Sequence, residues 1–243
     1  MAAAGAKVRH AGKVGEDGRW LLDLMAIKNI DIGMMKIDPG PTGHANIQVT
    51  PEGENSIVLF GGANRTITKS HIDEVLEDAQ PGDFLLLQNE ISALDYLIDQ
   101  ACKKEMSIVF NAAPMSADVN ALPLEAIELL VINEIEGFEL TTKTAPDDII
   151  SMLSSRFTST NILLTLGAVG SIYASKGDSI FQPAIKVDAV DTTGAGDTYL
   201  GFFLAGYSAG KSAADCLAMA TSAAALCVTR AGAATSITNL GEL

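Results

Sequence analysis

The segment Asp191-Thr-Thr-Gly-Ala-Gly-Asp197 decides how the rest of the chain is interpreted. It follows the partly apolar stretch 186–190 and precedes residues 198–207, which predict a helix. The small residues 194–196 leave backbone N–H groups open to a ligand. Because the N-terminus of a helix attracts negative charge, the segment predicts an anion site with Asp197 placed as a base. The alternative is that Asp197 simply caps the helix.

Outward from this segment, short apolar stretches alternate with longer helical ones. Stretches rich in Val, Ile and Leu predict strands at 84–87, 107–110, 129–132 and 161–166. Amphipathic stretches predict helices at 69–79, 92–104 and 147–157, and apolar-rich stretches predict two more at 198–207 and 212–228. This alternation is typical of a three-layer α/β/α fold, in which helices cover both faces of a mostly parallel sheet.

A predicted β-hairpin interrupts the alternation. Residues 43–50 and 56–60 favour strands, and they flank the turn-forming segment Pro51-Glu-Gly-Glu-Asn55. We expect residues 41–62 to form a small lid inserted into one domain that spans 1–243. No repeat or linker in the sequence indicates a second large domain.

Charge and cysteine content restrict the class of protein. The 30 acidic residues outnumber the 16 basic ones, which gives a formal net charge of −14. Because no cluster of Lys and Arg offsets this charge, we expect neither nucleic acid nor a membrane as a partner. The three cysteines are widely spaced in apolar settings, which predicts reduced thiols in a cytoplasmic protein. We expect no signal peptide.

Polar residues or glycines follow the four predicted strands outside the hairpin and the stretch 186–190. The segments are Gln88-Asn-Glu90, Asn111, Asn133-Glu-Ile-Glu136, Thr165-Leu-Gly-Ala-Val-Gly170 and the turn 191–197. Ligands bind beyond the carboxyl ends of the strands in open parallel sheets. A single polar turn is ordinary, but five together predict one site at one edge of the sheet.

These motifs resemble the ribokinase-like carbohydrate kinases, also called the PfkB family. The match at 191–197 is specific, and further matches run through nearly the whole chain. They are Lys13-Val-Gly-Glu-Asp-Gly18, Pro41-Thr-Gly43 with its hairpin, Pro51-Glu-Gly-Glu-Asn-Ser56, Gly62-Ala-Asn64, Asn133-Glu-Ile-Glu136, Thr165-Leu-Gly-Ala-Val-Gly170 and Val228-Thr-Arg-Ala-Gly232. The resemblance implies a transferase that uses ATP to phosphorylate a hydroxymethyl group of a small sugar, with D-ribose to D-ribose 5-phosphate as the first expectation.

The resemblance also implies roles for individual residues. Asp197 would remove the proton from the sugar hydroxyl, and Glu90 would face the sugar. Gly194, Ala195 and Gly196 would form an anion hole for the transferred phosphoryl group. Glu136 would orient Mg²⁺ through water, and Asn133 would lie near the ATP phosphates.

Two further groups of residues are implied for ATP and for a monovalent cation such as K⁺. The nucleotide would contact Thr165, Leu166, Gly167, Ala168, Val169, Gly170, Gly196 and Thr221. At Thr221 the family pattern has Asn near the adenine. The cation would be held around Asp191, Thr193, Cys227, Arg230, Gly232 and Ser236, several of them through backbone carbonyls.

The match to the family pattern starts late. Ala2-Ala-Ala-Gly-Ala6 resembles the helix that follows the family's Asn-x-Asp strand and its Gly-Gly-x-Gly-x-Asn segment. We therefore expect an N-terminally truncated domain without these two sugar-binding elements. Two alternatives stay open beside the sugar kinase. One is a kinase for nucleosides or another small alcohol, and the other is a pseudokinase or interaction subunit that binds nucleotide without turnover. The lid also implies a homodimer.

Overall fold

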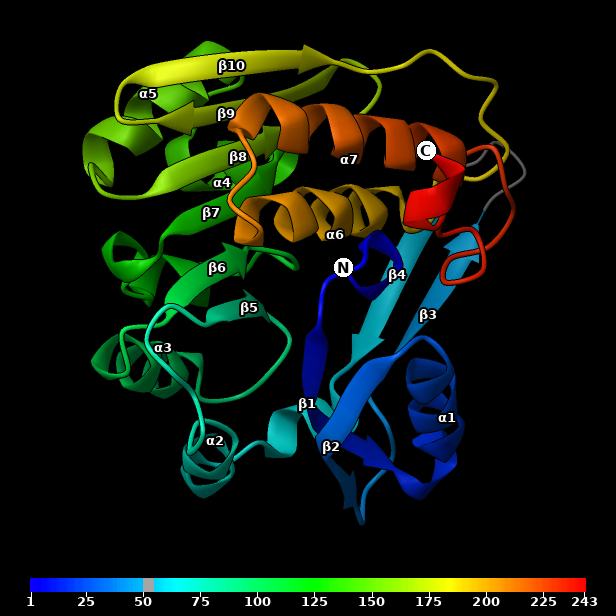
Figure 1. The fold of residues 1–243 in the computed structure, drawn as a ribbon. Coiled ribbons are helices and arrows are strands. Elements are labelled where there is room, and N and C mark those ends of the chain that lie inside the picture. Colours follow the sequence, from blue (N-terminus) through cyan, green and yellow to red (C-terminus); the bar gives the residue numbers. More distant parts are fainter. Residues whose placement is uncertain (50–54) are drawn as a thin grey trace.

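The computed structural model describes residues 1–49 and 55–243, and its largest element is a six-stranded sheet (Figure 1). Its strand order is β10-β9-β8-β7-β6-β5. The parallel strands are β5 (Phe84–Gln88), β6 (Ser107–Asn111), β7 (Leu129–Asn133) and β8 (Asn161–Thr165), and β9 (Gly170–Ser175) and β10 (Asp178–Pro183) run antiparallel at one edge. The ends of the parallel strands lie close together, because Gln88 pairs with Asn111 and Asn133 pairs with Thr165. Asn111 pairs with Val131, so β7 and β8 extend two residues further than β5 and β6.

Helices cover both faces of this sheet. One face carries α2 (Lys69–Val75), α3 (Leu94–Lys103), α4 (Glu134–Thr141) and α5 (Pro146–Arg156), and the other carries α6 (Ala195–Ser208) and α7 (Ala213–Cys227). Strand β7 shows how the two cores arise. Leu130 and Ile132 point into the first core, whereas Leu129 and Val131 point into the second. The predicted three-layer α/β/α fold is confirmed.

Local signals explain where several helices begin. Thr68 caps α2 by accepting a hydrogen bond from the His71 N–H, and Ser212 caps α7 by accepting one from the Asp215 N–H. Helix α5 begins at Pro146, where the missing N–H and fixed φ suit the first helical position. The predicted helix 69–79 is shorter than expected because it ends before the turn at Pro81 and Gly82.

A second parallel pair of strands lies beside the large sheet and was not predicted. Strand β1 (Val8–Gly15) pairs with β2 (Ile30–Asp38), and α1 (Arg19–Ile27) connects them (Figure 1). The pattern of β1 hides it, since Arg9, His10 and Ala11 are exposed in succession and a register shift lies between Arg9 and Ala11. The segment expected as a helix at 2–6 forms only a 3₁₀ turn at Ala2–Ala4.

The predicted hairpin is present in its paired parts. Strand β3 (His44–Val49) pairs antiparallel with β4 (Asn55–Phe60), with His44 opposite Phe60. Four of the five residues of the predicted turn, 51–54, lie outside the described ranges. Thr42 fastens the base of the hairpin, because its N–H and hydroxyl donate to Asp17 and its hydroxyl oxygen accepts from the Gly15 N–H.

None of the helices in the described ranges is long and apolar enough to cross a bilayer. The two helices with the longest apolar stretches, α6 and α7, pack against each other and against the sheet instead.

The buried His71 on α2 gives a test of the fold. Neither of its ring nitrogens has a hydrogen-bond partner within the described ranges, and its side chain is 5% exposed. Burial lowers the pKa of His71 below its usual 6.5, and Lys36 and Lys13 lower it further. As the pH falls below about 6.5, the unfolded chain binds a proton that the folded chain excludes, so this histidine destabilises the fold at low pH.

We expect His71→Leu to raise the free energy of unfolding by about 1 kcal/mol at neutral pH, because it removes two unsatisfied buried nitrogens. The variant should also lose stability less steeply between about pH 7 and pH 5 than the wild type. Urea denaturation followed by circular dichroism at several pH values measures both effects. His44→Gln, at an exposed histidine, is the control. Parallel pH curves for wild type and His71→Leu would show this interpretation to be wrong.

Candidate active site

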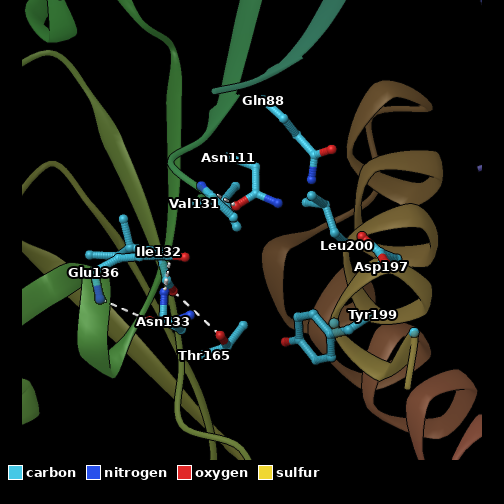
Figure 2. Close-up of a pocket in the computed structure, with 13 residues that line it drawn as sticks. Gln88, Asn111, Val131, Ile132, Asn133, Glu136, Thr165, Asp197, Tyr199 and Leu200 are labelled. Atoms are coloured by element: carbon cyan, nitrogen blue, oxygen red, sulfur yellow. Dashed lines mark hydrogen bonds between the residues drawn. The ribbon is translucent and has the colours of Figure 1, made fainter. Parts of the chain in front are cut away.

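A pocket opens between the carboxyl ends of the parallel strands and the N-terminus of α6 (Figure 2). Its lining comes from β5, β6, β7, β8, α4 and α6. The lining residues are Gln88, Asn111, Ala113, Val131, Ile132, Asn133, Glu136, Thr165, Gly194, Gly196, Asp197, Tyr199 and Leu200. The polar residues at the strand ends thus meet at one edge of the sheet, as the sequence predicted.

The turn 191–197 brings backbone amides to this pocket. Gly194 is the N-cap of α6 and has a φ of 76°, a conformation that favours glycine. The first N–H groups of a helix have no carbonyl partner inside the helix, so those of Gly196 and Asp197 remain available to an anion. An added Cβ at Gly196 would meet no atom within 4 Å, which shows that space is open there.

Asp197 lies in the first turn of α6 and is exposed in the pocket. It is not the N-cap, because Gly194 holds that position and no side chain caps this helix. The alternative of a simple capping aspartate is therefore wrong. The carboxylate faces the pocket opposite the strand ends (Figure 2).

Asn133 and Glu136 form a reciprocal capping box at the start of α4. The Asn133 side-chain oxygen accepts from the Glu136 N–H at 2.9 Å, and Glu136 Oε2 accepts from the Asn133 N–H at 2.8 Å. Glu136 is buried, which raises the pKa of its carboxyl, while the Asn133 N–H partly opposes the rise. The box uses one oxygen of each side chain, so the Asn133 NH₂ group and Glu136 Oε1 remain for a ligand.

The predicted nucleotide loop is a tight connection between β8 and β9. The Leu166 N–H donates to the Gly170 carbonyl at 2.8 Å, and the Val169 N–H donates to the Leu166 carbonyl at 3.0 Å. Thr165 lines the pocket, whereas the Leu166 side chain packs in the sheet core and Val169 is exposed. Gly167, Ala168 and Gly170 lie in the same turn but do not line this pocket.

The residues predicted around a cation come together in two adjoining loops. Asp191 accepts from the Thr193 N–H and from the Gly232 N–H, each at 2.9 Å. The Thr193 hydroxyl and the N–H groups of Gly232 and Thr193 lower the pKa of Asp191 to about 2. The side chain of Arg230 pairs with Glu242 at 2.7 Å, so its guanidinium is engaged outside the loop that Asp191 joins.

Cys227 and Ser236 are fully buried behind these loops. The Cys227 sulfur accepts from the Thr198 hydroxyl at 3.3 Å and lies 3.2 Å from the Ser236 hydroxyl. This contact connects the first turn of α6 with the end of α7. Within the described ranges, no group of three His, Cys, Asp or Glu side chains could hold a metal ion.

Glu90, Ala195, most of the predicted nucleotide residues and all of the predicted cation residues do not line the pocket, and several residues that do line it had no predicted role. Glu90 follows β5 in the loop before α3, and Thr221 is buried on α7. The missed residues Gln88 and Asn111 stand at strand ends that the sequence had marked as polar. Tyr199 and Leu200 were missed because the sequence does not show which face of α6 points to the pocket. They lie three and four residues after Gly196, which places them on the same face of the helix as Gly196.

Comparison with known proteins identifies the family. The model of the pfkB family carbohydrate kinase matches residues 1–240. Ribokinase from Staphylococcus aureus is 33% identical over 95% of this chain and 79% of its own length, and ribokinase from Arabidopsis thaliana is 31% identical over 98% of this chain and 67% of its own.

Solved structures agree with the sequence relatives. A ribokinase from Cryptococcus neoformans in complex with ADP superposes with a TM-score of 0.85 and 29% identity, covering 99% of this chain and 83% of its own. Arabidopsis thaliana ribokinase complexed with ribose and ATP gives a TM-score of 0.84 and 28% identity, covering 99% and 81%. This chain belongs to the pfkB family of carbohydrate kinases.

Proposed function

We propose that this protein transfers the terminal phosphoryl group of ATP to D-ribose, forming D-ribose 5-phosphate in the cytoplasm. The observation that carries the proposal is the pocket in which the amide-rich start of α6 and Asp197 face the strand ends with Asn133 and Glu136. The relatives named ribokinase support the choice of sugar, and the Arabidopsis relative was solved with ribose and ATP.

Phosphoryl transfer depends on positioning and on charge stabilisation more than on covalent chemistry. The N–H groups of Gly194, Gly196 and Asp197, together with the helix dipole, stabilise negative charge on the phosphoryl oxygens. Ala195 does not take the part expected of it, because its N–H donates to the Thr192 carbonyl at 3.2 Å. Asp197 lies beside them and accepts the proton of the attacking hydroxyl. This arrangement uses backbone amides where other nucleotide sites use a lysine, which suits an acidic protein.

Mg²⁺ fits the pocket beside Glu136. The free Glu136 Oε1 is a hard oxygen donor, which Mg²⁺ prefers, and Mg²⁺ keeps several waters when protein supplies few ligands. The ion neutralises phosphate charge when bound. Asn133 would direct its NH₂ group at the phosphates, and the loop 165–170 with Thr221 would hold the nucleoside part of ATP.

A monovalent cation fits the two loops that Asp191 joins. Both Asp191 oxygens already accept N–H groups, so this carboxylate orders the loops and leaves the backbone carbonyls as ligands. K⁺ suits such a site because carbonyl oxygens are its usual protein ligands. Thr193, Cys227, Arg230, Gly232 and Ser236 would take part through these loops.

The acceptor side of the pocket does not single out ribose, so one assay tests the alternatives together. Glu90, which would face the sugar, does not line the pocket, so Asp197 is the predicted sugar contact that does line it. A nucleoside or another sugar then remains an alternative acceptor, and a nucleotide-binding protein without turnover remains the alternative from another class. The exposed Val58, Leu59 and Phe60 on β4 support a homodimer through the lid.

Replacing the base tests the reaction directly. We expect Asp197→Asn to lower kcat by about 10²–10⁴-fold, because it removes the proton acceptor and leaves the amides in place. A coupled ADP-release assay with ribose, fructose and adenosine measures this and identifies the acceptor. Asp178→Asn, at an exposed aspartate on β10, is the matched control and should keep wild-type kcat. Unchanged kcat in Asp197→Asn would exclude the base, and no ADP release with any acceptor would favour the protein without turnover.

The Mg²⁺ proposal can be separated from the capping role of the same residue. Glu136→Gln keeps the oxygen that accepts from the Asn133 N–H but loses the charge. We therefore expect the Mg²⁺ concentration for half-maximal activity to rise about tenfold while the melting temperature changes little. If the Mg²⁺ titration of the variant overlays that of the wild type, Glu136 is only a helix cap.

Exchange of the monovalent cation tests the two loops. Replacing K⁺ with tetramethylammonium, which is too large for such a site, should lower wild-type kcat severalfold at constant ionic strength. Asp191→Ala should lower kcat in K⁺ and leave little difference between the salts, because the loops lose the carboxylate that joins them. Equal wild-type rates in both salts would contradict the site.

A further inference from the structure

Two buried hydroxyls meet beside the pocket, between the sheet and α6. The Tyr199 hydroxyl lies 2.6 Å from the Ser171 hydroxyl, and the two residues are 8% and 0% exposed. Tyr199 stands two residues after Asp197, and its ring forms part of the pocket wall (Figure 2). Neither residue belongs to the site inferred from the sequence.

Ser171 connects this contact with the other wall of the pocket. It is the strand partner of Thr165 at the base of the loop 166–169. The Thr165 hydroxyl in turn donates to the Ile132 carbonyl at 3.4 Å, directly before Asn133. Hydrogen bonds and strand pairing therefore run without a break from the capping box to the helix that carries Asp197.

The remaining contact between α6 and the sheet near the pocket is apolar. Leu200, Phe203 and Leu204 pack there against strand residues of the second core. Apolar contacts are not directional, so they tolerate small shifts of a helix along a sheet, whereas a hydrogen bond fixes one position. Burial raises the pKa of Tyr199, with the Ser171 and Thr221 hydroxyls opposing the rise, so the phenol is neutral and can donate.

The far end of α6 has a second tyrosine of the same kind. Tyr207 donates to Glu128 at 2.9 Å and accepts from the Asn161 side chain at 3.1 Å. It lies eight residues beyond Tyr199, which is about 12 Å along a helix. Hydroxyl contacts thus attach α6 to the sheet at both ends, but only the Tyr199 contact adjoins the pocket.

We propose that the Tyr199–Ser171 pair positions the first turn of α6, so that Asp197 and the amides of Gly194 and Gly196 stand at the right distance from the nucleotide side of the pocket. The proposal rests on the proposed kinase function. Small displacements of reacting groups lower rates strongly, by up to about 10²-fold for 1 Å. The pair acts through the placement of α6 and does not itself touch the reacting atoms.

A double-mutant cycle tests this role. Tyr199→Phe keeps the ring and Ser171→Ala breaks the same bond from the other side. We expect each variant to lower kcat about tenfold. The double variant should lower kcat by the same tenfold, because both changes remove one bond. The KM for ATP should stay within about threefold of the wild-type value. A sample that is partly unfolded would also show a lower kcat with an unchanged KM. Each kcat is therefore divided by the folded fraction, which circular dichroism measures.

Tyr207→Phe is the matched control, since it removes a tyrosine hydroxyl from the same helix. It should lower the melting temperature and keep wild-type kcat. Three outcomes would overturn the proposal. These are a normalised kcat for Tyr199→Phe within twofold of wild type, a loss near a hundredfold in the double variant, or an equal kcat loss in Tyr207→Phe.

A separate measurement distinguishes failure of the pair from failure of the proposed function. If the wild-type protein phosphorylates no acceptor, the kinase proposal fails and kcat says nothing about the pair. Hydrogen exchange of the Ala195 and Thr198 amides, which donate to the Thr192 and Gly194 carbonyls, then decides. Exchange should be about tenfold faster in Tyr199→Phe and in Ser171→Ala, and unchanged in Tyr207→Phe. Wild-type exchange in the first two variants would overturn the positioning role.

Discussion

The structure depends on a sheet whose central strands are buried on both faces. In β7, Leu129 to Ile132 are all buried, with alternate side chains in two separate cores. Polar groups on such a strand can reach water only at its ends. Because the parallel strands end within two residues of one another, Gln88, Asn111, Asn133 and Thr165 lie at one edge. The site is thus a consequence of how the sheet is buried.

Helix α6 supplies the other half of the site for a similar reason. Residues 198–206 are buried without interruption, since the helix lies between the sheet and α7. A helix that is apolar on all sides must sit inside the protein, and its N-terminal amides then point along a fixed direction. The sheet and the helix together place the N-terminus of α6, which attracts anions, opposite the side-chain amides of Gln88, Asn111 and Asn133.

Much of this could be predicted from sequence, because burial on both faces leaves continuous apolar stretches. The strands at 107–110, 129–132 and 161–166 were recognised in this way, and the partly exposed edge strand at 84–87 was recognised by its apolar residues alone. The motifs at 133–136 and 191–197 were recognised by residue type and spacing. Strands β1 and β2 were missed since their side chains are mostly not buried and show no clear alternation. Tyr199 was missed because contacts between distant hydroxyls leave no local pattern.

The fastening at Thr42 has a consequence for how the hairpin can move. Its hydroxyl and N–H are held by Gly15 and Asp17, and an added Cβ at Gly15 would come within 2.4 Å of the Gly40 carbonyl. The Ala63 N–H also donates to the Pro41 carbonyl at 3.0 Å, which secures the returning strand. These contacts hold both ends of the hairpin, so it cannot rotate freely about residues 41–43 and 61–63. Any movement of the hairpin must therefore carry β1, α1 and β2 with it, and the ion pair between Lys36 and Glu74 attaches β2 in turn to α2.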